Sequence, residues 1–231
     1  MGKGNKRSVT SVKQRGANEG AQPGAQTVNI PKRGMLSLGP AAVRQSHRET
    51  LNWAYVPSYR TLAGSSYSEF FQITINNPYD PDVAVGGTSA HGFTKYMAFY
   101  SKCFVLGARI KVSGVVGQIA GPGCVLGMNI TTSTSASTAA VTNIQDGYCK
   151  YQVVYANPDR FSFDLGCDIG RFLDKPDVLD DPSLFCTSGG GPLELVVAHI
   201  WGSNYSTSAQ QISCVIELEM DCVFTDPIPF T

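Results

Sequence analysis

Nine lysines and arginines near the N-terminus are the residues whose type and position most clearly predict chemistry. They stand singly or in pairs within the first 48 residues, where Glu19 is the only acid, so this stretch carries a net charge of +8. Lysine and arginine side chains bind phosphate through charge and hydrogen bonds, without reading base sequence. We therefore predict that nucleic acid is bound by Lys3, Lys6, Arg7, Lys13, Arg15, Lys32, Arg33, Arg44 and Arg48.

The rest of the chain has the opposite charge. It contains nine basic and seventeen acidic residues, a net charge of −8, so the whole chain is formally neutral. A cationic tail on an anionic body predicts a polyanionic partner for the tail alone. Because residues 1–47 contain no Phe, Tyr or Trp on which a base could stack, we expect them to neutralise phosphates without sequence preference. A solvated tail or a nuclear-import signal is the alternative interpretation.

Residues for catalysis are sparse. The only histidines are His47, His91 and His199, with no pair at metal-ligand spacing, and there is no G-x-S-x-G, P-loop or dinucleotide fingerprint. His47 falls in the basic segment, and His199 falls in an apolar run, where a core histidine with satisfied hydrogen bonds is expected. The sequence therefore predicts a protein that is not an enzyme and needs no cofactor.

Two acidic clusters allow alternatives. Asp174, Asp177, Asp180 and Asp181 crowd one loop and could bind Ca²⁺ at a subunit interface, although the favoured interpretation is a solvated turn with capping aspartates. A second row, Glu217, Glu219 and Asp221, alternates with apolar residues. We interpret this row as a polar outer strand face or a subunit contact.

The seven cysteines give no sign of a disulfide framework or a metal site. Their number is odd and no pair has C-x-x-C spacing. Most alternate with apolar residues, which predicts small buried side chains in a reducing compartment. No apolar run is long enough to span a membrane, so no membrane partner is expected.

Two segments of different character must position these residues. Residues 1–47, rich in Gly, Gln, Asn and Ser, cannot bury enough apolar surface to offset the entropy of ordering and predict a disordered arm. Residues 48–231 predict one domain built from strands of period 2. The predicted strand faces are Tyr67, Glu69, Phe71, Ile73 and Ile75; Phe104, Leu106, Ala108, Ile110 and Val112; Cys124, Leu126, Met128 and Ile130; Cys149, Tyr151, Val153 and Tyr155; and Phe161, Phe163 and Leu165.

The end of the chain carries the clearest strand. Every second residue from Ile212 to Phe224 is apolar, and a register slip of one residue would bury three carboxylates. The run 193–201 is apolar on both faces and predicts a strand buried on both sides. Short helices are predicted within 91–102 and 168–174, and a surface loop over 131–144. About eight antiparallel strands joined by long loops predict an all-β fold, a single jelly-roll sandwich.

One stretch resembles a known family. It runs Asn77-Pro78-Tyr79-Asp80-Pro81-Asp82, Gly86-Gly87, Gly92-Phe93, Tyr96, Tyr100 and then Val105-Leu106-Gly107-Ala108-Arg109-Ile110-Lys111-Val112. This pattern resembles the capsid (coat) proteins of small circular Rep-encoding single-stranded DNA (CRESS-DNA) viruses. The resemblance covers about residues 70–113, although the arm has isolated basic residues in place of the dense arginine tracts of many relatives.

The resemblance implies a capsid protein that assembles with itself into a small icosahedral shell, in the simplest case of about 60 subunits (T=1). It implies a basic arm that faces the particle interior and packages single-stranded genomic DNA, and a location in the virion after assembly in the host nucleus or cytoplasm. RNA remains open, because similar jelly rolls coat small positive-strand RNA viruses. A non-viral binding module, such as a lectin or a TNF-like oligomer, is the other alternative. The sequence names no host receptor.

Overall fold

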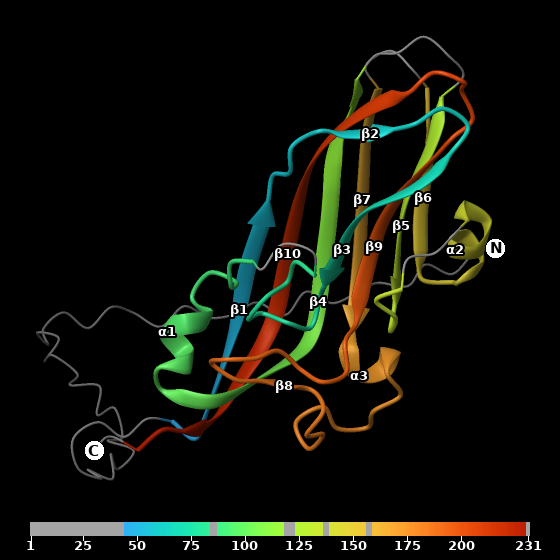
Figure 1. Cartoon of the computed structure of the whole chain (residues 1–231). Helices are drawn as coiled ribbons and strands as arrows, with labels where there is room; N and C mark the ends of the chain where they lie inside the picture. Colours follow the sequence, from blue (N-terminus) through green and yellow to red (C-terminus); the bar gives the residue numbers. More distant parts are fainter. Residues whose placement is uncertain (1–43, 84–86, 118–122, 136–138, 156–158, 230–231) are drawn as a thin grey trace, which may run out of the picture. The chain divides into compact units, whose positions relative to one another are not determined.

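The structure, a computed structural model, describes residues 44–83, 87–117, 123–135, 139–155 and 159–229. In this part of the chain the elements alternate strands with three short helices (Figure 1). The elements are β1 (Ser46–Tyr55), β2 (Arg60–Leu62), β3 (Tyr67–Thr74), α1 (Phe93–Met97), β4 (Tyr100–Gly117), β5 (Cys124–Thr131), α2 (Ala140–Gln145), β6 (Cys149–Val154), β7 (Asp159–Asp168), α3 (Ile169–Phe172), β8 (Phe185–Cys186), β9 (Val197–Asn204) and β10 (Gln210–Pro227).

The strands form two antiparallel sheets. Sheet A has the order β1-β10-β4-β7, with the short β2 and β8 paired to β10 and β4. Sheet B has the order β3-β9-β5-β6. Counting only the eight long strands along the chain, the first, eighth, third and sixth form sheet A, and the second, seventh, fourth and fifth form sheet B. This connectivity is that of a jelly roll, and it confirms the predicted fold.

The core lies between the two sheets and follows the alternation of the long strands. In β10, Ile212, Ile216 and Leu218 are buried, while the alternate residues Glu217 and Glu219 are exposed. Leu218 lies opposite Trp53 of β1 and Ile110 of β4, so the first and last strands share the same core layer. The predicted register of this strand is confirmed.

The predicted face of β4 is wrong at one end, because a β-bulge interrupts the strand. Asp221 pairs with Gly107 and Cys222 with Val105, which leaves Leu106 as an extra residue. An extra residue reverses the alternation beyond it. Val105 therefore joins Ala108 in the core between the sheets, while Phe104 packs in a separate cluster with Val178 and Leu184.

A second bulge divides β3 in the same way. Glu69 pairs with Trp201 and Phe71 with Ile200, so the ladder skips Phe70. Phe71 faces the core between the sheets, whereas Tyr67 packs with Trp201 in a smaller cluster on the outer face of sheet B. The five residues predicted to share one face are thus split between two faces.

The outer face of sheet B is partly covered by α2. Ala140 and Ile144 of this helix pack on Trp201, whose indole Nε1 donates to Asn129 Oδ1 at 3.0 Å. The predicted surface loop over 131–144 is therefore wrong at its C-terminal end, where a helix begins. None of the helices in the described residues is long and apolar enough to span a membrane.

Three boundaries differ from the prediction. β1 begins at Ser46, so His47, placed in the arm by the sequence, pairs with Phe224 inside sheet A. Helix α1 covers only residues 93–97 of the predicted 91–102, because β4 begins at Tyr100. β9 begins at Val197, and Leu193, predicted to start a buried strand, is 88% exposed. The predicted turn over 168–174 is confirmed by α3.

Candidate nucleic-acid interface

The predicted nucleic-acid-binding residues fall into two groups. Arg44 is exposed just before β1, and Arg48 lies within β1. The other seven lie outside the described residues, together with the arm that carries them: Lys3, Lys6, Arg7, Lys13, Arg15, Lys32 and Arg33.

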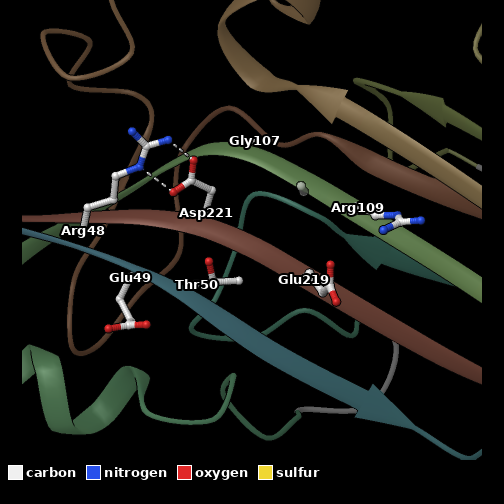
Figure 2. A pocket seen from close by; sticks show the side chains of 8 residues that line it. Arg48, Glu49, Thr50, Gly107, Arg109, Glu219 and Asp221 are labelled. Carbon is white, nitrogen blue, oxygen red and sulfur yellow. Dashed lines mark hydrogen bonds and ion pairs between the residues drawn. The ribbon is translucent and has the colours of Figure 1, made fainter. Parts of the chain in front are cut away.

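Arg48 is already bound to a carboxylate. Its Nε donates to Asp221 Oδ1 at 2.8 Å, and its Nη2 donates to Asp221 Oδ2, so the pair is bidentate (Figure 2). Hydrogen bonding and attraction to Asp221 raise the pKa of Arg48 above its usual value. A phosphate would have to displace this carboxylate, so Arg48 is a less available ligand than the sequence indicated.

The outer face of sheet A repeats this neutralisation across three strands. Arg109 of β4 donates to both carboxylate oxygens of Asp164 on β7, at 2.8 and 2.5 Å, and this hydrogen bonding lowers the pKa of Asp164. Lys111 lies 3.5 Å from Glu217. Glu219 of β10 stands opposite Arg109 of β4 in the ladder, and Figure 2 shows both side chains. The acidic row is thus a polar outer strand face, as predicted, and two of its carboxylates form ion pairs with Arg48 and Lys111.

Two carboxylates of the acidic loop beyond α3 are held by local partners. Asp181 is bound by Lys175 Nζ at 2.8 Å and by Ser183 Oγ at 2.6 Å, and Asp177 accepts from the backbone N–H of Leu179. Among the described residues, no three His, Cys, Asp or Glu side chains come together in a way that could hold a metal ion. The calcium alternative for Asp174, Asp177, Asp180 and Asp181 therefore gains no support from the arrangement of these side chains and stays a prediction.

The Lys175–Asp181 pair predicts a specific response to acid. Hydrogen bonds from Lys175 and Ser183 lower the pKa of Asp181 to about 2, from an ordinary value of 3.8. A lowered pKa stabilises the fold above the ordinary value, and this contribution disappears as pH falls toward about 2. We expect Asp181→Asn to lower the melting temperature near neutral pH, and the gap to the wild type to close as pH falls toward about 2. Thermal unfolding across this range measures it. The exposed Asp180→Asn serves as control, and a gap that stays constant would contradict the assignment.

His199 is a buried histidine with all its partners, as predicted. Nδ1 lies 2.6 Å from Glu69 Oε1, while Nε2 lies 2.8 Å from the Ser133 carbonyl oxygen and 2.9 Å from Thr131 Oγ1. These atoms resemble a hydroxyl–imidazole–carboxylate relay. A carbonyl oxygen can only accept, so Nε2 carries a hydrogen and cannot take the proton of Thr131. The group links β3, β9 and the 131–135 turn, and it is not a nucleophilic site.

The cysteines behave as small apolar residues. All seven are free thiols, and all but Cys149 are buried. Burial raises the pKa of Cys124, Cys167 and Cys214 to about 11, so these thiols stay protonated at neutral pH. This environment suppresses nucleophilic and redox chemistry.

No protein-family model and no curated protein matches the sequence. Solved virus structures are similar to it in fold. A chain of Desmodium yellow mottle tymovirus is 8% identical, with a TM-score of 0.45, over 84% of this chain and 95% of that one. A chain of tobacco necrosis virus is 11% identical, with a TM-score of 0.47, over 80% and 97%. The decameric BFDV capsid protein is 8% identical, with a TM-score of 0.41, over 78% and 99%. Similarities this distant assign no function to the chain.

Proposed function

We propose that this chain is the capsid protein of a small virus, a shell subunit that assembles with itself and packages single-stranded nucleic acid through its basic arm. The observation that carries this proposal is the charge division: a segment of +8 joined to a jelly-roll domain of −8. A shell needs cations only toward its contents. Arg48, Arg109 and Lys111 are paired with carboxylates, so the outer face of sheet A offers little free positive charge for a phosphate.

Exposed apolar residues on β6 support self-association. Tyr151 and Val153 point to the same side of this edge strand and are 54% and 47% exposed, and Tyr155 just beyond it is 68% exposed. Contiguous apolar surface of this kind is typical of contacts between proteins. Repetition of such contacts by closed symmetry would place one arm per subunit inside the particle, in the simplest case an icosahedron of about 60 subunits.

The resemblance over residues 70–113 favours single-stranded DNA as the packaged molecule. Phosphate neutralisation works equally on RNA, so a coat protein of a small positive-strand RNA virus is the second candidate. The virion is the proposed location in both cases.

Deletion of residues 2–33 separates assembly from packaging. We expect the truncated protein to form particles still, because the jelly roll and its apolar contacts remain, and to lose nuclease-protected nucleic acid, because seven of the nine predicted phosphate ligands are gone. Electron microscopy and the absorbance ratio of purified particles measure both properties. A matched control keeps the lysines and arginines of residues 2–33 at their positions and replaces every other residue of this segment with Gly, Ser or Gln. Normal packaging by the truncated protein would contradict the role given to the arm.

A further inference from the structure

Three aromatic rings form a column from the core to the surface beside the start of β1. Phe224 of β10 is fully buried, and the Tyr96 ring of α1 lies 4.8 Å from it, centroid to centroid. His47 of β1 stacks on Tyr96 at 4.9 Å, with 25° between the ring planes. His47 also stacks beside Tyr100, with 6.5 Å between the ring centroids, and its side chain is 30% exposed, so part of the imidazole reaches the surface. A flat aromatic ligand stacked there would continue the column at ordinary ring spacing.

The column opens into a groove between β1 and α1. The groove has a volume of about 540 Å³. Its lining combines aromatic rings with polar and charged groups, among them His47, Glu49, His91, Lys95, Tyr96 and Phe99. Phe99 is 45% exposed, and Lys95 is also exposed. Aromatic surface next to a cation is the combination with which proteins bind single-stranded nucleic acid, because every base has a face that stacks.

Glu49 gives the groove a polar preference. Its Oε2 accepts from the Tyr96 hydroxyl at 3.1 Å, yet its side chain remains 43% exposed. Figure 2 shows Glu49 on the side of β1 that faces α1. A carboxylate repels phosphate and accepts hydrogen bonds from the amino groups on base edges. The centre of the groove therefore suits a base, and the ammonium group of Lys95 suits the phosphate beside it.

The groove lies where the arm joins the domain. The exposed Arg44 precedes His47 by only three residues, so one predicted phosphate ligand is close to the groove along the chain. No aromatic residue precedes His47 in the sequence. We propose that the groove between β1 and α1 binds a base of single-stranded nucleic acid, stacked on His47 with its amino edge toward Glu49. This inference rests on the proposed packaging function and adds a base contact to phosphate binding.

The test uses the full chain and a single-stranded DNA oligonucleotide that carries the fluorescent base 2-aminopurine, whose emission falls when it stacks. We expect the wild type to quench the probe. His47→Ala should reduce this quenching and weaken binding by roughly five- to 150-fold. His47→Phe keeps a ring and should retain both, which separates stacking from any effect on folding. Tyr205→Ala, which removes an exposed ring from the loop between β9 and β10, should behave as the wild type.

Two results would overturn the inference. One is equal quenching and affinity for His47→Ala and the wild type. The other is a loss in His47→Phe as large as in His47→Ala. Neutralisation of the arm distinguishes this failure from failure of the proposed function: if it abolishes binding while His47→Ala has no effect, the arm's role stands and the groove's role does not. If the wild type binds no single-stranded nucleic acid, both are wrong.

Discussion

Binding of a single-stranded oligonucleotide by the full chain is expected to weaken steeply as salt rises. Each phosphate that a lysine or arginine neutralises releases counterions and contributes about −0.7 to the slope of log K against log salt. If all nine predicted residues contact phosphate, the slope is about −6. Glutamine at Lys3, Lys6, Arg7, Lys13, Arg15, Lys32 and Arg33 should reduce it to about −1. Fluorescence anisotropy at several salt concentrations measures this.

The matched control for this experiment lies on sheet A. Arg109 and Lys111 are bound to Asp164 and Glu217, so Arg109→Gln with Lys111→Gln should leave the slope nearly unchanged. A slope that survives neutralisation of the arm, or that falls with the control, would place the phosphate contacts on the domain.

His199→Leu is expected to destabilise the fold by roughly 3–5 kcal/mol, since it leaves the carboxylate of Glu69 buried without its partner. The side chains of His199 and Glu69 are only 3% and 9% exposed, and Glu69 Oε2 already has no hydrogen-bond partner among the described residues. The double variant with leucine at both positions should recover much of the loss, because no carboxylate then remains buried without a partner. Urea unfolding at one fixed protein concentration measures the change.

Thr131→Val is the control for the His199 experiment. It removes the Thr131 hydroxyl, with its contacts to His199 and to the Ser133 backbone, and leaves the Glu69–His199 pair intact, so a smaller loss of about 1–2 kcal/mol is expected. A single His199→Leu variant as stable as the wild type would contradict the assignment. So would a double variant less stable than His199→Leu alone.

The alternation of apolar residues predicted most of the jelly roll, because side chains in a strand point to opposite faces. β10 followed the prediction throughout. The errors in β3 and β4 have one cause: the extra residues Phe70 and Leu106 reverse the alternation. A bulge is defined by the partner strand, which lies far away in sequence. The period of a single strand therefore cannot reveal it.

The candidate sites depend on similar long-range pairing. Glu69 and His199 are 130 residues apart, and no motif joins them. One signal was present: an acid and a histidine each stood in otherwise apolar strand patterns, and buried charges need partners. The groove at the arm could not be predicted, because the column joins rings from β1, α1 and β10. The phosphate ligands were predicted by charge alone, and no signal in the sequence indicated that Arg48 is paired with a carboxylate 173 residues away.

The proposal that this chain forms a viral shell is tested most directly by electron microscopy of the purified full-length protein, with its nuclease-protected nucleic acid sequenced. A capsid protein of this kind should give uniform closed particles that contain single-stranded nucleic acid. Sequencing would then distinguish DNA from RNA. Monomers or small open oligomers under assembly conditions, with no protected nucleic acid, would contradict the proposal and favour a jelly-roll binding module.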